Sequence, residues 1–115
     1  MAKRNDRVAE EIKKVVTEVI DNEVMDKEAS LKLVTVTEVE VSEELEYANV
    51  YFTTLNENKR EVEDILNKYR GLLRSAVAKN IRLRKAPEIY VKYDQSVDYG
   101  SRIEDLLNQI KNEGK

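Results

Sequence analysis

The side chains of this sequence that are best placed to do chemistry are Lys and Arg residues gathered in one short segment. Between Ile65 and Pro87 the chain carries seven cations and no Asp or Glu, so the rest of a 115-residue chain of net charge -3 carries -10. Such a cluster suits a polyanion, because Arg makes paired hydrogen bonds to phosphate and Lys acts as a point charge. It would also suit a solvated surface that only keeps the protein soluble. The candidate residues for binding a nucleic acid are Lys68, Arg70, Gly71, Arg74, Lys79, Arg82, Arg84 and Lys85.

Catalytic and metal-binding chemistry has few residues to draw on. The sequence contains no His and no Cys, which excludes Ser-His-Asp and Cys-His nucleophile systems, imidazole or thiolate zinc sites, and disulfides. Carboxylates alone could still hold a magnesium or calcium ion, or act as an acid and a base. The acidic clusters around Glu61 and Glu104, however, fall at predicted helix starts, where carboxylates interact favourably with the helix dipole. We therefore expect a protein that is not an enzyme and needs no cofactor.

The elements that must position the cations are predicted by hydrophobic spacing and by capping residues. Apolar residues three and four positions apart indicate helices, whereas alternating ones indicate strands. The sequence predicts a helix over 6–22, strands over 31–41 and 47–53, a long helix that starts after Asn58 and ends before Pro87, a strand over 88–93 and a helix over 101–110. The expected fold class is α+β, a two-layer domain with helices packed on one face of a three-stranded sheet.

The alternation within the strands predicts which face of the sheet is buried. In the first strand the expected buried set is Leu31, Leu33, Thr35, Thr37, Val39 and Val41. Residues 25–30 are predicted to be an irregular connector before this strand, and residues 42–45 the turn of a β-hairpin after it. Tyr47, Tyr51 and Tyr90 fall on the opposite face. Their rings could stack on unpaired bases or, as is commoner, form cross-strand pairs.

Gly71 lies within the long helix, where glycine costs about 1 kcal/mol relative to Ala. This cost predicts a kink or a break in the helix at Gly71. Glycines between two helices also let phosphates approach the backbone, as in the GxxG loop of K-homology domains. Only one glycine of such a loop is present here, so a packing or kink role is the commoner alternative.

Length and composition indicate a single domain over residues 1–115, with residues 112–115 as a frayed tail. The longest apolar runs are only two or three residues, too short to cross a bilayer or to form a signal peptide. We therefore expect a cytoplasmic monomer that does not contact a membrane.

A series of stretches in fixed order resembles the bacterial ribosome-binding factor A family over nearly the whole chain. The more specific ones are residues 71–75, 82–89 and 94–96, which read GLLRS, RLRKAPEI and DQS. The further matching stretches are Arg7-Val8 with Ile12, residues 34–42 with Leu45 and Ala48, Val50-Tyr51, Ile103 and Leu106-Leu107. No single stretch is diagnostic, but their order and spacing together are difficult to obtain otherwise.

The resemblance implies a K-homology-like fold of the type II order, α-β-β-α-kink-α-β with a C-terminal helix, in which an interrupted helix replaces the GxxG loop. In the family the interruption looks like Ala-x-Gly, whereas this sequence has Tyr69, Arg70 and Gly71. The implied activity is that of a non-catalytic ribosome biogenesis factor that binds the free 30S subunit and 16S rRNA. It would support late maturation and processing of the rRNA 5′ end, and would matter most in the cold. Holding one rRNA conformer needs only differential affinity for that state.

Other functions and other roles for single residues stay open. The acidic hairpin around residues 43–46, or an exposed strand edge, could bind a basic ribosomal protein. The basic segment could instead bind any single-stranded RNA. Arg82 and Arg84 could help to orient the chain into the third strand, with Leu83 buried between them. Ser96 could cap a turn before the final helix.

Overall fold

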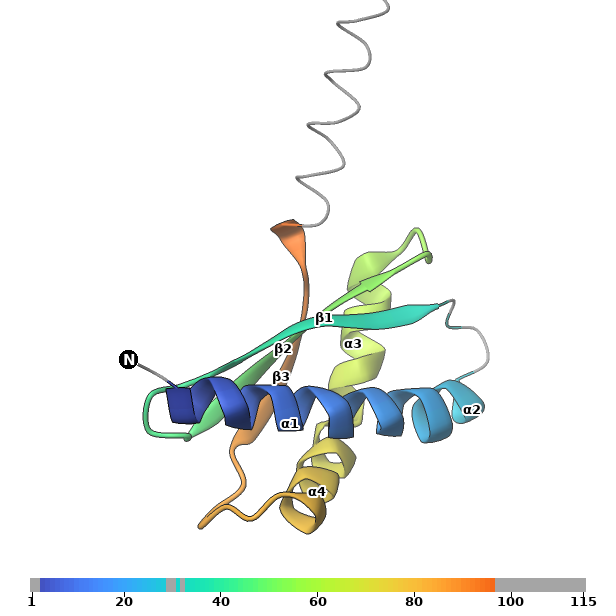
Figure 1. The fold of residues 1–115 in the computed structure, drawn as a ribbon. Helices are drawn as coiled ribbons and strands as arrows, with labels where there is room; N and C mark the ends of the chain where they lie inside the picture. Colours follow the sequence, from blue (N-terminus) through green and yellow to red (C-terminus); the bar gives the residue numbers. More distant parts are fainter. Residues whose placement is uncertain (1–2, 29–30, 32, 97–115) are drawn as a thin grey trace, which may run out of the picture.

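The computed structural model describes residues 3–28, 31 and 33–96 of the chain. Its elements follow one another as α1 (Lys3–Val19), the π-helical turn η1 (Ile20–Val24), α2 (Met25–Lys27), β1 (Val34–Val41), β2 (Tyr47–Thr54), α3 (Lys59–Lys68), α4 (Arg70–Asn80) and β3 (Glu88–Tyr93). Figure 1 shows this arrangement, which confirms the predicted order α-β-β-α-kink-α-β. The helix predicted over 101–110 and the tail over 112–115 lie outside the described residues.

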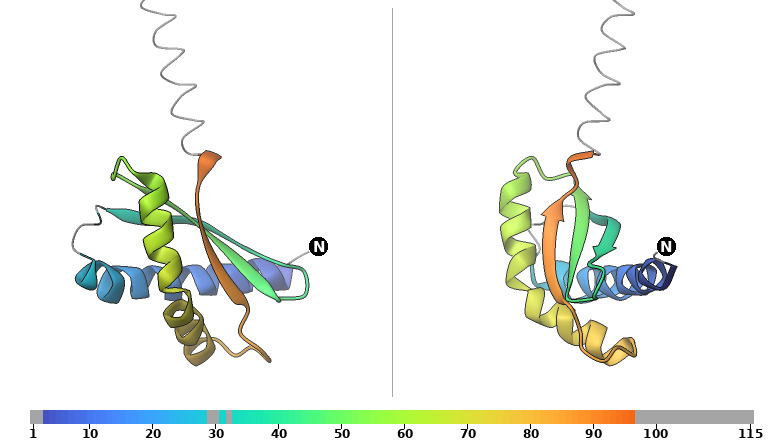
Figure 2. Two further views of the ribbon diagram at one scale, coloured as in Figure 1. Left: turned by 180° about the vertical axis from the view of Figure 1, so that it is seen from behind. Right: turned by 90° about the vertical axis from the view of Figure 1, so that its left-hand side faces the viewer.

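The three strands form one mixed sheet with the order β1-β2-β3. β1 and β2 pair antiparallel as the predicted hairpin, and β3 joins β2 in parallel. One face carries the buried residues Val36, Val50, Phe52 and Val91, and the other carries exposed ones such as Tyr47 and Tyr90. Helix α1 packs on β1 and α4, while α3 and α4 pack along β3 (Figures 1 and 2). The prediction of helices on one face of a three-stranded sheet is therefore confirmed.

The first helical segment is longer than the sequence predicts. α1 runs through η1 into α2, so residues 25–27 are helical and not part of an irregular connector. The predicted end near Asn22 was wrong because the apolar stripe continues for another turn through Ile20 and Val24, which are both buried. The Met25 N–H donates to the Ile20 carbonyl, the spacing of a π-helical turn, which adds one residue to the turn.

A β-bulge in β1 changes which side chains face the core. β1 carries one residue more than β2 at Thr37, between the pairs Val36 with Phe52 and Glu38 with Tyr51. An inserted residue shifts the alternation by one position. The buried side chains of β1 are Val34 and Val36 before the bulge and Val39 after it. The predicted buried set was therefore wrong for Leu33, Thr35 and Thr37.

The long second helix is interrupted at Tyr69, whose backbone (φ -97°, ψ 11°) ends α3 and precedes α4. Gly71 lies inside α4 and has no positive φ, and apart from its own helix no described residue lies within 4 Å of the position of a Cβ. The predicted break is confirmed. It lies at Tyr69, the first residue of the interruption that the resemblance implied, and not at Gly71, where helix propensity had placed it. The Tyr69 hydroxyl donates to Glu28 Oε2 at 2.6 Å, and this contact with the residue after α2 holds the side chain at the break.

Helix α3 fixes the outer edge of β3 through side chains. Asn67 Nδ2 donates to the Val91 carbonyl at 2.8 Å, and the Val91 N–H donates to Asn67 Oδ1 at 3.0 Å. Glu63 Oε2 accepts a hydrogen bond from the Tyr93 N–H at 2.8 Å. These side chains satisfy backbone groups that a fourth strand would otherwise pair with. The position of β3, and of the loop that leads into it, is therefore set by α3.

Candidate nucleic-acid interface

Residues 81–87 join α4 to β3 and carry the cations Arg82, Arg84 and Lys85, so we call this segment the basic loop. Apolar residues of the same segment anchor it. Ile81 is buried, Leu83 is half-buried against the core, and Pro87 is buried directly before β3. Because anchors and cations are interleaved along the segment, packing of the anchors leaves the three cations exposed to solvent.

Arg74 connects α4 to the end of the basic loop. Its Nε and Nη2 donate to the Ala86 carbonyl at 3.2 and 3.0 Å, and its Nη1 lies 2.9 Å from Glu88 Oε2. The Arg74 side chain is 34% exposed, so most of it is packed between these elements. The sequence placed Arg74 among the candidate RNA-binding residues. In the structure this side chain orients the chain into β3, the role that the sequence suggested for Arg82 and Arg84.

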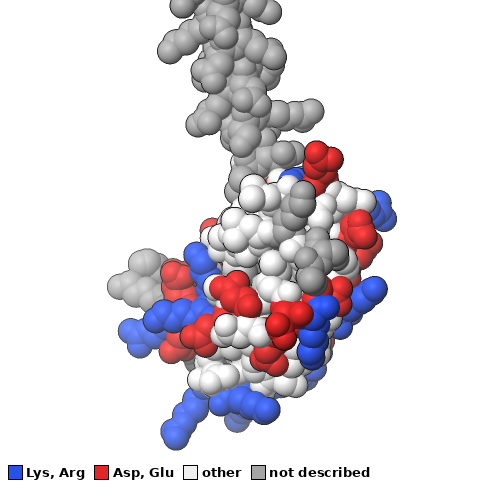
Figure 3. Space-filling model, turned by 90° about the vertical axis from the view of Figure 1, so that its right-hand side faces the viewer, with Lys and Arg blue, Asp and Glu red and all other residues white. Residues whose placement is uncertain are grey.

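Among the described residues, no acidic side chain forms an ion pair with a cation of the basic loop. Within residues 3–28, 31 and 33–96 the only ion pair is that of Arg74 with Glu88, so Arg82, Arg84 and Lys85 have no acidic partner there. Figure 3 shows Lys and Arg side chains projecting from the lower end of the molecule, where α4 and the basic loop lie, below a band in which both signs mix. Unpaired cations on a protruding surface favour contact with phosphates.

The other candidate residues lie around this loop and do not form one cluster with it. Lys68 and Arg70 flank the break between α3 and α4, and Gly71 follows on the exposed surface of α4. The Arg70 guanidinium lies over the Tyr90 ring, 5.2 Å from its centroid. Lys79 borders a hollow that is also lined by Glu18 and Glu23, so its surroundings are of mixed charge. The structure thus brings together Arg82, Arg84 and Lys85, with Arg74 behind them.

The exposed tyrosines predicted for the open face of the sheet are confirmed, and two of them form a pair. Tyr47 and Tyr90 are 45% and 39% exposed, and their rings meet edge to face with centroids 6.5 Å apart. This pair is the cross-strand contact that the sequence offered as the commoner alternative. Tyr51 stands apart from it and donates to Glu40 Oε1 at 3.4 Å. Burial and then the neighbouring Glu40 raise the pKa of Tyr51 above its usual value.

The Tyr69 hydroxyl also has a perturbed acidity. The hydrogen bond to the Glu28 carboxylate is the main cause that raises the pKa of Tyr69, because only the protonated phenol can donate it; burial and the charge of Glu28 add to the rise. The protonated phenol is therefore the form that holds the helix break in place.

Several of these positioning residues were not found from the sequence. Asn67 and Glu63 lie in a helix, and nothing in their spacing predicts that they bond the edge of β3. Near the end of β3, Asp94 accepts hydrogen bonds from the Ser96 N–H at 2.9 Å and from the Thr37 hydroxyl. The turn that Ser96 was suggested to cap lies outside the described residues. The DQS match at residues 94–96 therefore includes a structural bond between β3 and the bulge of β1.

The part of the chain that the structure describes contains neither a metal-binding group nor a membrane-spanning helix. No group of three or more Asp and Glu side chains there is arranged so that it could hold a metal ion. No helix there is long and apolar enough to cross a membrane.

The fold is that of a small K-homology-like α+β domain. An interrupted helix pair packs on a mixed three-stranded sheet, and a cationic loop leads into the parallel strand. The sequence profile described as ribosome-binding factor A matches residues 4–107. Ribosome-binding factor A of Legionella pneumophila strain Lens is 41% identical over 109 residues, which cover 94% of this chain and 87% of that protein. The chain belongs to the ribosome-binding factor A family.

Solved structures agree with this assignment. A Thermotoga maritima protein described as a ribosome binding factor A superposes with a TM-score of 0.65 at 33% identity, covering 80% of this chain and 88% of that one. The crystal structure of ribosome-binding factor A from Thermus thermophilus gives a TM-score of 0.68 at 21% identity, covering 77% and 94%. A homology model of the Thermus thermophilus factor, fitted into a cryo-EM map of a 30S complex, gives 0.66 at 21% identity, covering 79% and 96%. At 21% identity, the last two comparisons show a shared fold.

Proposed function

We propose that this protein is a ribosome biogenesis factor that binds the free 30S subunit and contacts 16S rRNA through the basic loop. In this proposal it acts in the cytoplasm, assists late maturation and processing of the rRNA 5′ end, and matters most in the cold. The observation that carries the proposal is the set of three exposed cations, without an ion-pair partner among the described residues, on a loop anchored by Ile81, Leu83 and Pro87. Family membership supports the choice of target.

In this proposal the protein acts by binding and does not catalyse a reaction. A factor that prefers one rRNA conformer shifts the population toward that conformer by its differential affinity alone. A rigid cationic loop is suited to this task, since phosphates must match its spacing. Lys68, Arg70, Gly71 and Lys79 would add contacts at the flanks, and Arg74 would act by positioning the loop.

The proposal is tested by co-sedimentation of the purified protein with free small subunits, large subunits and whole ribosomes over a salt series. We expect selective retention by the small subunit that weakens as salt rises. Replacement of Arg82, Arg84 and Lys85 by Glu should remove about three phosphate contacts and flatten the slope of log affinity against log salt by roughly 2 to 3.

The matched control changes the same amount of charge elsewhere. Lys14, Lys27 and Arg60 are exposed cations outside the basic segment. Their replacement by Glu should leave most of the selective binding intact. Equal binding to every particle, or equal losses in the two triple variants, would contradict the proposal.

A further inference from the structure

A groove opens between the hairpin turn of residues 42–46 and the basic loop. Its volume is about 660 Å³, and its lining includes Glu44, Glu46, Arg84, Lys85, Tyr47 and Tyr90. The turn and the loop lie at the same end of the sheet in both Figure 1 and Figure 2. The groove therefore joins the cationic surface to the open face of the sheet, where the tyrosine pair lies.

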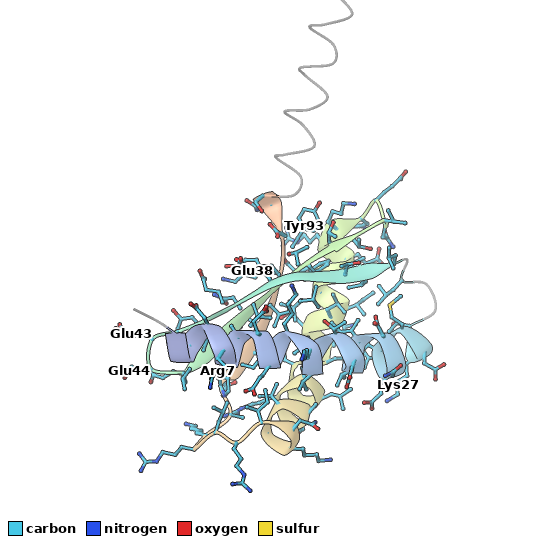
Figure 4. The ribbon with its side chains drawn as sticks, in the orientation of Figure 1. Arg7, Lys27, Glu38, Glu43, Glu44 and Tyr93 are labelled. Carbon is cyan, nitrogen blue, oxygen red and sulfur yellow. The ribbon has the colours of Figure 1, made fainter. Side chains whose placement is uncertain are left out.

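Hydrogen bonds fix the wall formed by the hairpin turn. The Ser42 hydroxyl oxygen accepts from the N–H groups of Glu46 and Tyr47 at 2.9 and 3.1 Å. Asn5 Nδ2, from α1, donates to the Ser42 and Glu43 carbonyls, both at 3.1 Å. Figure 4 shows Glu43 and Glu44 at this turn, beside the start of α1. The Glu88 N–H donates to the Glu46 carbonyl at 2.9 Å, which ties the two walls together at the base of the groove.

The two walls carry opposite charges that do not neutralise each other. Glu43, Glu44 and Glu46 lie on one wall, and Arg84 and Lys85 lie on the other. For residues 3–28, 31 and 33–96 no ion pair joins these two sets, and none of the three glutamate side chains makes a hydrogen bond there. The carboxylates are thus free acceptors, and the cations are free donors, on either side of the same space. A ligand that fits must present donors at one end and an anion at the other.

The tyrosine pair adds a stacking surface inside this groove. Tyr90 has the Arg70 guanidinium over its ring, 5.2 Å from the centroid. Tyr47 is the more exposed ring, and within the described residues its ring contact is the one with Tyr90. Tyr47 therefore offers the surface on which a base could stack. An aromatic ring beside a cationic track is the combination that binds single-stranded nucleic acid.

We propose that this groove binds one unpaired guanine nucleotide of single-stranded RNA, an inference that rests on the proposed function and assigns a base preference to it. The base stacks on Tyr47 and its phosphates face Arg84 and Lys85. Guanine is selected because its Watson–Crick edge presents two adjacent donors, N1–H and N2–H, which one carboxylate accepts together. Adenine and cytosine place a ring acceptor beside their amino group, and uracil flanks its one donor with two carbonyls. The acidic wall repels the phosphates and so sets the orientation of the nucleotide.

The test is binding of the full chain to four fluorescent RNA hexamers at low salt, measured by anisotropy. The hexamers are hexauridine and the same sequence with one central guanosine, adenosine or cytidine. We expect the guanosine hexamer to bind about fivefold or more tightly than the other three, the lower range for one paired hydrogen-bond contact, since all four bases can stack. Tyr47→Ala should weaken binding of all four hexamers and abolish this preference, because the ring no longer holds the base against the acidic wall. Tyr51→Ala is the matched control, because Tyr51 lies on the same strand face but outside the groove, and it should keep the preference.

A second pair of variants tests the acidic wall. Replacement of Glu43, Glu44 and Glu46 by Gln should tighten binding of all four hexamers and bring their affinities close together. The same change at Glu38 and Glu40, on the open face outside the groove, should tighten binding and keep the preference for guanosine.

The outcomes separate this inference from the proposed function. Equal affinities for the four hexamers, no binding of any of them, or an unchanged preference in Tyr47→Ala would overturn the guanine site. If salt-dependent retention by small subunits persisted alongside such a result, the basic loop proposal would stand without it. Loss of subunit retention in the basic loop variant, together with a guanosine preference in the unsubstituted protein, would support both proposals. A chain that binds neither small subunits nor hexamers would overturn both.

Discussion

Substitution of Arg74 should affect stability more than RNA binding. Arg74 is one of the cations between Ile65 and Pro87, but its guanidinium already binds the Ala86 carbonyl and Glu88. Truncation by Arg74→Ala removes the bonds from Nε and Nη2 to the Ala86 carbonyl and the ion pair with Glu88. A hydrogen bond from a charged donor contributes about 1.5 to 3 kcal/mol. The ion pair adds about 0 to 1 kcal/mol, since Glu88 is 56% exposed. We therefore expect a loss of about 2 to 3 kcal/mol in the free energy of unfolding.

This loss corresponds to a fall in Tm of roughly 10 °C or more for a domain of this size. The assay is thermal unfolding followed by circular dichroism, combined with urea denaturation. Arg82→Ala is the control in the same segment, because Arg82 is exposed. It should change the free energy of unfolding by less than about 0.5 kcal/mol. Arg74→Lys keeps the charge but loses the planar fork, so its stability should lie between those of Arg74→Ala and the unsubstituted protein.

The Arg74 and Arg82 variants should rank in the opposite order when retention by small subunits is measured instead of stability. At a temperature where all of them are folded, Arg82→Ala should weaken retention by small subunits more than Arg74→Lys does. Equal melting temperatures for Arg74→Ala and Arg82→Ala would refute the assignment of Arg74 as the residue that orients the basic loop.

Three further predictions concern the elements that carry the basic loop. Asn67→Ala should lower the free energy of unfolding by about 1 to 3 kcal/mol in urea denaturation, because two bonds to the backbone of β3 are lost. Asn80→Ala is the control: it loses a bond within its own helix and should lower the free energy of unfolding clearly less. Equal losses in the two variants would contradict a stabilising contact between Asn67 and β3. Gly71→Ala should raise Tm slightly, by an amount equivalent to about 0.5 kcal/mol, since the site is helical and open, and a fall in Tm would show a backbone need for glycine. Tyr69→Phe should lower the stability of the protein below pH 10, because the raised pKa of Tyr69 means that its bond to Glu28 stabilises the fold in the protonated form. This stability difference should disappear as pH rises through the pKa of Tyr69 in the folded state. A difference in Tm between the two proteins that stayed constant to higher pH would contradict this prediction.

The sequence predicted the elements that hydrophobic spacing controls. The hairpin, the Asn58 cap on α3, the strand over 88–93, and the order of helices and strands up to that strand follow from local patterns and are confirmed. The break between α3 and α4 was also predicted, although at the glycine and not at Tyr69. Propensity identifies a weak position in a helix, whereas the observed break lies at Tyr69, whose hydroxyl bonds Glu28, 41 positions earlier in the chain.

The sequence failed where a contact joins distant residues or where one residue shifts a pattern. Thr37 looks like any other member of an alternating strand, yet the bulge at this residue reverses the buried face before it. Charge alone could not separate Arg74 from Arg82, because only the fold brings the Ala86 carbonyl to the Arg74 guanidinium. The extent of the domain over 1–115, the monomeric state and the individual RNA-binding residues stay predictions.

The measurement that tests the central claim most directly is site-directed cleavage of rRNA from an iron chelate tethered to the protein. The chain contains no Cys, so a single introduced cysteine gives one defined probe position. Lys85→Cys places the probe on the basic loop, and Lys27→Cys places it on α2, which Figure 4 shows away from that loop. With free small subunits, we predict strong, localised cleavage of 16S rRNA from residue 85 and weak cleavage from residue 27. Equal cleavage from both positions, or none from residue 85, would contradict the claim that the basic loop is the surface that meets rRNA.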